Sequence, residues 1–124
     1  MYTIAKKFKF DSAHQLTGLP EGHKCGNMHG HTYTVEVQIW SNTLTKEGFV
    51  VDFTDLAFIK RYIDDNLDHK FLNEVLGFQT TSENLARHFH WFVEEWLVSN
   101  GVGDAHVKSV RVSETESTWA EYAR

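Results

Sequence analysis

Two long segments of this 124-residue chain alternate between apolar and polar positions, and they constrain its fold more than any other feature. In residues 2–16 the even-numbered face carries Ile4, Phe8, Phe10, Ser12 and His14. From residue 29 the alternation returns, and the odd-numbered face carries His29, His31, Tyr33, Val35, Val37 and Ile39. Successive side chains of a strand point to opposite faces, so each segment predicts a strand with one buried face. Three histidines then lie on the buried faces.

Two later stretches repeat apolar residues at helical spacing. The first predicted helix is marked by Leu56, Ile59, Ile63 and Leu67. The second is expected to begin at Thr80, because the spacing from Thr80 to Glu83 is that of a capping box, and to end near residues 100–101. Residues 68–79, between the two helices, are expected to be irregular.

Three further segments predict strands. Residues 49–52 predict a short one, and alternation returns in residues 106–114 and 117–122. On the first of the last two strands, Glu114 ends an otherwise apolar row. The order β-β-α-α-β-β indicates an α+β fold, with an antiparallel sheet covered on one face by two helices. The exposed edges of such a sheet predict a homo-oligomer, because pairing between subunits would cover them.

Composition limits the function. The length suits one domain, residues 1–124. A net charge of −5 argues against general nucleic-acid binding, and no apolar run is long enough to span a membrane. The N-terminus lacks the apolar core of a signal peptide, and a single cysteine, Cys25, fits a reducing compartment. The expected location is therefore the cytoplasm.

Histidine is abundant, with eight residues in the chain. His29 and His31 lie two positions apart on one strand face, about 6–7 Å between Cα atoms, so both can reach one ion. His14 ends the inward face of the neighbouring predicted strand and supplies a third imidazole. A catalytic zinc ion typically takes three protein ligands, so these residues predict a zinc site. Three histidines near the C-terminus are expected to be ordinary surface or half-buried residues: His88, His90 and His106.

Cys25 lies beside Lys24 in a glycine-flanked loop. A neighbouring lysine and a divalent cation both favour the thiolate form, which indicates a reactive thiol. Two alternatives stay open at this point. The thiol could fill a gap as a small apolar group, or it could be a fourth ligand in a closed, structural Cys-His₃ site without chemistry.

A carboxylate and an imidazole also stand together at Asp68 and His69, just after the first predicted helix. Such a pair orients the ring and raises its basicity, as general acid–base catalysis requires, although it also occurs as helix-end capping. Glu114 is costly to bury unless a donor pairs with it. The two parallel N–H donors of a pterin or guanine ring would match its carboxylate.

A series of short motifs runs in order from Phe10 to Tyr122. They are residues 10–14 (FDSAH), 21–31 (EGHKCGNMHGH), 51–53 (VDF), 67–69 (LDH) with 72–73 (LN), 81–84 (TSEN) and 113–115 (SET). This series resembles the 6-pyruvoyltetrahydropterin synthase superfamily. The short gap between Cys25 and His29 is similar to that of its bacterial 6-carboxy-5,6,7,8-tetrahydropterin synthase branch, because the pyruvoyl branch typically has a longer gap.

The resemblance implies the tunnelling fold, whose β-β-α-α-β-β subunits join edge to edge into a barrel. It implies a homo-oligomer, a hexamer built as a dimer of trimers, with active sites at subunit interfaces. The implied zinc ligands are His14, His29 and His31. The implied acid–base groups are Cys25 as general base and the Asp68–His69 pair with Glu114 as proton relay. The implied pterin contacts are Glu114, Thr81 and Glu83, of which Glu83 also fits the capping box.

The resemblance also implies a reaction. The substrate would be 7,8-dihydroneopterin triphosphate, and zinc-dependent loss of triphosphate and acetaldehyde would give 6-carboxy-5,6,7,8-tetrahydropterin for queuosine biosynthesis. Lys24 and His23 could contact the triphosphate or be solvated loop residues. Two alternatives are 6-pyruvoyltetrahydropterin synthesis, in which the carbon side chain is kept, and a noncatalytic zinc-binding module.

Overall fold

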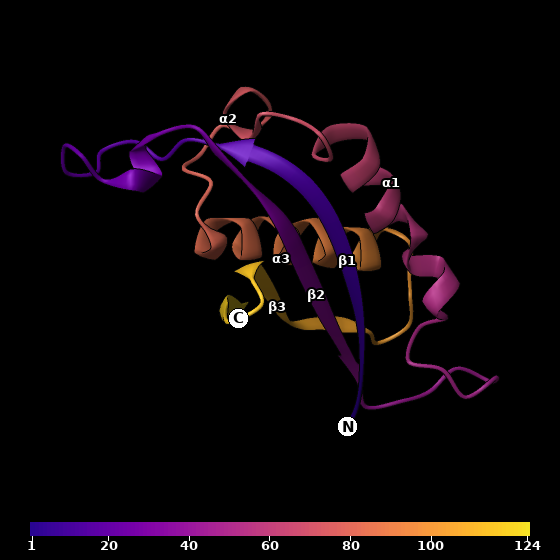
Figure 1. Cartoon of the computed structure of the whole chain (residues 1–124). Helices are drawn as coiled ribbons and strands as arrows, with labels where there is room; N and C mark the ends of the chain where they lie inside the picture. The colour runs from indigo at the N-terminus through magenta and orange to yellow at the C-terminus, as the bar shows by residue number, and fades with distance from the viewer.

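The computed structural model describes residues 1–124 and contains both long strands that the alternation predicts (Figure 1). Strand β1 spans Tyr2–His14 and strand β2 spans His29–Ser41. They pair antiparallel, with Phe10 opposite Tyr33 and His14 opposite His29. The even-numbered side chains from residue 8 to residue 14 are buried, as predicted. The pairing therefore brings the histidines of both strands together at one end of the sheet.

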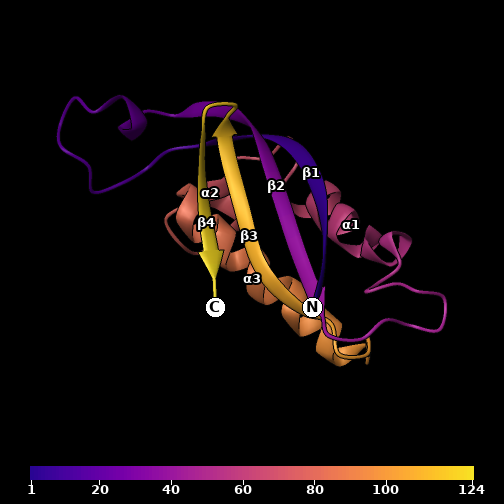
Figure 2. The ribbon, with the colours of Figure 1, turned by 90° about the horizontal axis from the view of Figure 1, so that it is seen from below.

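Two C-terminal strands complete a four-stranded antiparallel sheet in the order β1-β2-β3-β4. Strand β3 spans His106–Thr115 and β4 spans Thr118–Ala123, within a residue or two of the predicted limits. Figure 2 shows the helices on one face of this sheet. Helix α1 spans Ala57–Asn66, and helix α3, Ser82–Ser99, packs against β3 and β4. The predicted α+β architecture is confirmed.

Two predictions about the middle of the chain were wrong. Residues 49–52 form no strand: Val50 and Val51 are buried, but they pair with no neighbouring strand, and a 3-10 helix, η2 (Phe53–Leu56), follows. The stretch expected to be irregular contains the short helix α2 (Leu72–Val75). Val50 and Val51, both β-branched, are therefore buried without being part of a sheet.

The cap of helix α3 was placed one residue too early. The N-cap is Thr81, whose hydroxyl accepts a hydrogen bond from the backbone N–H of Asn84. Thr80 is buried and contacts His14 instead, and Glu83 is exposed in the first turn. The predicted capping box between Thr80 and Glu83 therefore does not form.

His90 also differs from expectation. It was predicted to be at most half-buried, but it is fully buried and neither ring nitrogen has a hydrogen-bond partner. Its ring packs edge-on against Tyr122 at a centroid distance of 5.0 Å. Burial lowers the pKa of His90, the charge of Glu94 opposes that shift, and the charge of Arg124 adds to it. The folded protein therefore holds this imidazole neutral.

His90→Leu is expected to make the protein less sensitive to acid. Below the ordinary histidine value of 6.5, the unfolded chain binds a proton at His90 that the folded protein excludes, so the free energy of unfolding falls as pH falls. Leucine removes this pH-dependent loss and the two unpaired nitrogens. The free energy of unfolding of His90→Leu near pH 5 should therefore exceed that of the unmutated protein by about 1–2 kcal/mol. Urea unfolding at about pH 7.5 and about pH 5 measures the effect. An equal loss of stability in both proteins on acidification would contradict it.

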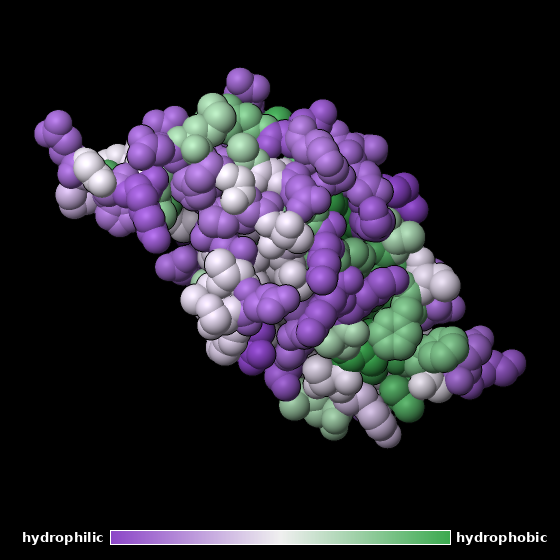
Figure 3. Space-filling model, in the orientation of Figure 1, coloured by the Kyte–Doolittle hydropathy of each residue, from purple (hydrophilic) through white to green (hydrophobic).

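The surface offers two features relevant to function. In Figure 1, residues 15–28 extend from the end of β1 to one side of the sheet. The face in Figure 3 is largely polar, and its main apolar area lies at the lower right, where Figure 1 draws the segment between β2 and α1. Exposed large apolar side chains of that segment are Leu44, Phe49 and Phe53. None of the helices is long and apolar enough to cross a membrane.

Candidate metal centre

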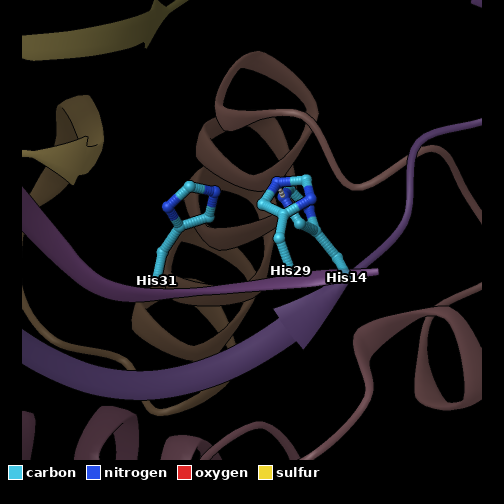
Figure 4. Close-up of side chains that lie close together, drawn as sticks. All are labelled: His14, His29 and His31. Carbon is cyan, nitrogen blue, oxygen red and sulfur yellow. Dashed lines mark hydrogen bonds between the residues drawn. The ribbon is translucent and has the colours of Figure 1, made fainter. Parts of the chain in front are cut away.

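His14, His29 and His31 meet at one end of the buried sheet face (Figure 4). One ring nitrogen from each lies within 4.8 Å of the others. The ring centroids are 4.6 Å apart for His14 and His29, and 4.8 Å apart for His29 and His31. Because the three residues come from paired strands of fixed register, the sheet itself sets their separation. The predicted group is brought together, and it could hold a metal ion.

Hydrogen bonds to the backbone fix the tautomers of two of these rings. Nδ1 of His14 lies 3.0 Å from the carbonyl oxygen of Thr80, and Nδ1 of His29 lies 2.7 Å from that of Asn27. A carbonyl oxygen only accepts, so both Nδ1 atoms carry hydrogen and both Nε2 atoms keep a lone pair. Partners of this kind orient metal-binding histidines.

The two Nε2 atoms of His14 and His29 face each other at 3.0 Å. Two lone pairs at this distance repel unless a cation lies between them. Ligand nitrogens about 2.0–2.1 Å from a tetrahedral zinc ion would be about 3.3 Å apart, close to this spacing. The donor set therefore fits a bound metal ion.

Burial also keeps two of these imidazoles, those of His14 and His31, in the form that binds metals. Desolvation lowers the pKa of His14, and the nearby charge of Glu114 only partly opposes this shift. Desolvation likewise lowers the pKa of His31 and outweighs the opposing effect of Glu114. Both rings are therefore neutral at physiological pH, with lone pairs available to a cation.

Cys25 lies beside the histidines without joining them. It is half-buried in a short 3-10 helix, η1 (Lys24–Gly26), and lines a pocket of about 250 Å³ with Lys24, His29 and His31. The cluster of potential ligand atoms contains the three histidines and not the Cys25 sulfur. The Nδ1 atom of His23 accepts a hydrogen bond from the Cys25 backbone N–H at 3.1 Å, so this ring supports the loop.

Glu114 approaches the histidines from β3. Its Oε2 atom lies 3.3 Å from Nε2 of His31, without the alignment of a hydrogen bond. Glu114 also lines a pocket of about 380 Å³ with Thr81 and Glu83. The three residues expected to contact a pterin therefore share one pocket beside the candidate metal centre.

Sequence reasoning missed two neighbours of the histidines. The Thr80 backbone holds the His14 ring, which depends on a contact between segments 66 positions apart. Tyr33 is fully buried, and its ring lies edge-on to those of His14 and His31 at centroid distances of 5.8 and 5.5 Å. Tyr33 lies two positions after His31 on the same strand face, and this spacing could have identified it as a neighbour of the histidines. Burial, together with the charge of Glu114, raises the pKa of Tyr33, so the phenol stays protonated.

The Asp68–His69 pair forms, but on the other face of the sheet. Nδ1 of His69 lies 3.0 Å from an Asp68 oxygen, and the two cluster with Asp11. Asp11 points away from the core, whereas His14 on the same strand points into it. The Asp68 carboxylate accepts a hydrogen bond from the Asp11 backbone N–H. This hydrogen bond and the one with His69 hold the pKa of Asp68 below its ordinary value. Within one chain, the pair and the candidate metal centre therefore occupy opposite faces.

Similarity to known proteins covers nearly the whole chain. The sequence model described as "6-pyruvoyl tetrahydropterin synthase" matches residues 3–124. The 6-carboxy-5,6,7,8-tetrahydropterin synthase of Haemophilus influenzae is 34% identical over 148 residues, covering 98% of this chain and 99% of that protein. The protein of the same name from Synechocystis is 38% identical over 128 residues, covering 98% and 93%.

A solved structure agrees at the level of the fold. The 6-pyruvoyl tetrahydropterin synthase of Caenorhabditis elegans superposes with a TM-score of 0.82 at 24% identity, covering 99% of this chain and 95% of that one. The family resemblance noted in the sequence motifs is confirmed.

Proposed function

Because this chain belongs to the 6-pyruvoyl tetrahydropterin synthase family, we propose that it is a zinc-dependent 6-carboxy-5,6,7,8-tetrahydropterin synthase acting in queuosine biosynthesis. The substrate is 7,8-dihydroneopterin triphosphate, which with water gives the carboxylated tetrahydropterin, acetaldehyde and triphosphate. The observation that carries the proposal is the cluster of His14, His29 and His31, with Cys25 lining a pocket with two of them. This arrangement combines a three-ligand metal site with a separate thiol.

The proposed roles of the residues rest on their positions. His14, His29 and His31 would hold zinc, which when bound supplies Lewis-acid polarisation of the substrate's side-chain hydroxyls. Cys25, beside the histidines but outside the ligand group, accepts a proton from the substrate's side chain as general base. Hydrogen moved from side chain to ring reduces the ring without a nicotinamide cofactor. Lys24 lines the same pocket and offers a positive charge to the triphosphate.

Glu114 is the proposed anchor of the pterin ring. The pocket that it lines with Thr81 and Glu83 adjoins the histidines, since Glu114 itself contacts His31. Two parallel N–H donors of the ring match the two oxygens of a carboxylate in a charge-assisted pair. The substrate side chain would then extend toward the metal-binding nitrogens.

The Asp68–His69 pair enters this scheme through a neighbouring subunit. On its own chain the pair lies across the sheet from the metal centre, so we propose that it completes the proton relay of the next subunit's site. Two features favour assembly: strand β4 leaves one side unpaired, and Phe49 and Phe53 are exposed before α1. The proposed assembly is a homo-oligomer with active sites at the interfaces.

Product identification tests the proposal directly. The zinc-loaded protein is incubated with 7,8-dihydroneopterin triphosphate, and the products are identified by mass. The expected products are 6-carboxy-5,6,7,8-tetrahydropterin and acetaldehyde. A product that keeps the whole carbon side chain would instead identify a 6-pyruvoyltetrahydropterin synthase. Recovery of unchanged substrate would favour a noncatalytic zinc-binding module.

Glu114→Gln is expected to weaken pterin binding and leave zinc in place. Glutamine keeps the shape of the side chain but presents an N–H to a ring donor, which should cost about 2–4 kcal/mol of binding free energy. Zinc content should not change, because Glu114 lies outside the ligand cluster. Calorimetry with 7,8-dihydroneopterin measures the affinity, and Glu116→Gln, on the exposed turn that follows, is the control. Equal affinity in Glu114→Gln and the unmutated protein would remove the reason for naming a pterin.

A further inference from the structure

Tyr33 carries a polar group that the fold does not use. Its side chain has no exposed surface, and its hydroxyl has no hydrogen-bond partner. A buried donor without a partner destabilises a protein, and most buried polar groups are paired. The ring itself is well accommodated, because it stacks on Phe10 at a centroid distance of 4.9 Å. Phenylalanine would provide the same packing, so the hydroxyl requires its own explanation.

The sheet register places this hydroxyl-bearing side chain next to Glu114. Strands β2 and β3 pair Val35 with Val112 and Thr34 with Ser113. Continued by one residue, the same antiparallel register would bring Tyr33 opposite Glu114, and the charge of Glu114 does act on the Tyr33 phenol. Directly opposed residues have Cβ atoms about 4.5–5.5 Å apart, within reach of a tyrosine and a glutamate. Tyr33 is therefore a cross-strand neighbour of the proposed pterin anchor.

Metal binding changes what Glu114 can pair with. In the structure Oε2 of Glu114 lies 3.3 Å from Nε2 of His31. That nitrogen cannot both hold a metal ion and donate a hydrogen bond to a carboxylate. When His31 is a ligand, this nitrogen is no longer available to Glu114, while Tyr33 offers a buried hydroxyl with no hydrogen-bond partner.

We propose that Tyr33 is a positioning residue for substrate binding: its hydroxyl donates a hydrogen bond to the Glu114 carboxylate and fixes the two oxygens for the N–H donors of the pterin ring. This inference rests on the proposed pterin-binding role of Glu114. Tyr33 itself does not touch the ring or the metal in this arrangement. It acts through the orientation of Glu114, so its effect on binding requires an intact carboxylate at position 114.

A double-mutant cycle tests this dependence. Dissociation constants for 7,8-dihydroneopterin, which lacks the triphosphate leaving group, are measured by calorimetry for the zinc-loaded protein and for Tyr33→Phe, Glu114→Gln and the double variant. Tyr33→Phe is expected to weaken binding about 10-fold on its own and less than about 2-fold in the Glu114→Gln background. Zinc content should stay the same, and the thermal midpoint of the zinc-free protein should not fall, because the hydroxyl has no hydrogen-bond partner there.

Tyr62→Phe is the matched control. The Tyr62 hydroxyl is hydrogen-bonded to His88 at 2.6 Å, so its removal should lower the thermal midpoint and leave the pterin dissociation constant unchanged. Unaltered pterin affinity in Tyr33→Phe would overturn the inference, as would equal weakening with and without Glu114. Loss of zinc from Tyr33→Phe would overturn it too, because the residue would then act on the metal centre. If the unmutated protein bound no pterin, the proposed function would fall together with this inference.

Discussion

His31→Ala is expected to lose most of its bound zinc while remaining folded. The two remaining ligands, His14 and His29, cannot enclose the ion. Loss of a residue that only hydrogen-bonds to a metal ligand lowers metal affinity by up to about 100-fold, so loss of a ligand itself should lower zinc affinity by more than that. The fold should survive, since His31 is outside the buried apolar core and part of its side chain is exposed. Elemental analysis after dialysis against a weak chelator measures the zinc content, and circular dichroism measures the fold.

His106→Ala provides the matched control for that experiment. His106 pairs with Glu94 near the opposite end of β3 and lies outside the histidine cluster, so its loss should leave zinc at one ion per chain. Full zinc occupancy in His31→Ala would show that the ligand set is wrong. Zinc loss in both variants would point instead to a general effect on stability.

The fold was predictable from the sequence because its two longest strands each bury one face. Alternation through residues 2–14 and 29–41 identifies both the strands and their buried sides. The prediction failed at Val50 and Val51, which are β-branched and buried like strand residues. Local sequence does not show whether a segment will reach a pairing edge of the sheet, and residues 49–52 pair with no strand. The cap of α3 shifted from Thr80 to Thr81 for a related reason, because a distant contact with His14 takes Thr80 into the core.

The site was predictable where strand geometry determined it. His14, His29 and His31 follow from two alternating strands and their register. The face occupied by Asp68 and His69 did not follow, because a loop has no fixed periodicity. His69 adopts a left-handed backbone conformation, with φ of 57°, which is uncommon for a residue other than glycine. Its backbone N–H donates to the Asp11 carbonyl at 2.6 Å, a contact that only the folded chain reveals.

Cys25→Ala is expected to abolish most turnover and keep the zinc. If the thiol is a general base, its removal should lower the turnover rate by roughly 10²–10⁴-fold. Zinc content should stay near one ion per chain, since the sulfur lies outside the cluster of ligand nitrogens. Steady-state turnover of 7,8-dihydroneopterin triphosphate and elemental analysis of the same preparation measure the two quantities together.

Cys25→Ser separates the chemistry of the thiol from its packing. Serine nearly keeps the size of the side chain, but its hydroxyl is a much weaker acid than a thiol, so Cys25→Ser should be almost as inactive as Cys25→Ala. Met28→Ala, an exposed change in the same loop, should keep full turnover. Activity retained in Cys25→Ser but lost in Cys25→Ala would make the residue a space-filling group. Loss of zinc together with activity in both variants would identify Cys25 as a fourth ligand of a closed structural site, and the proposed chemistry would then have no base on this loop.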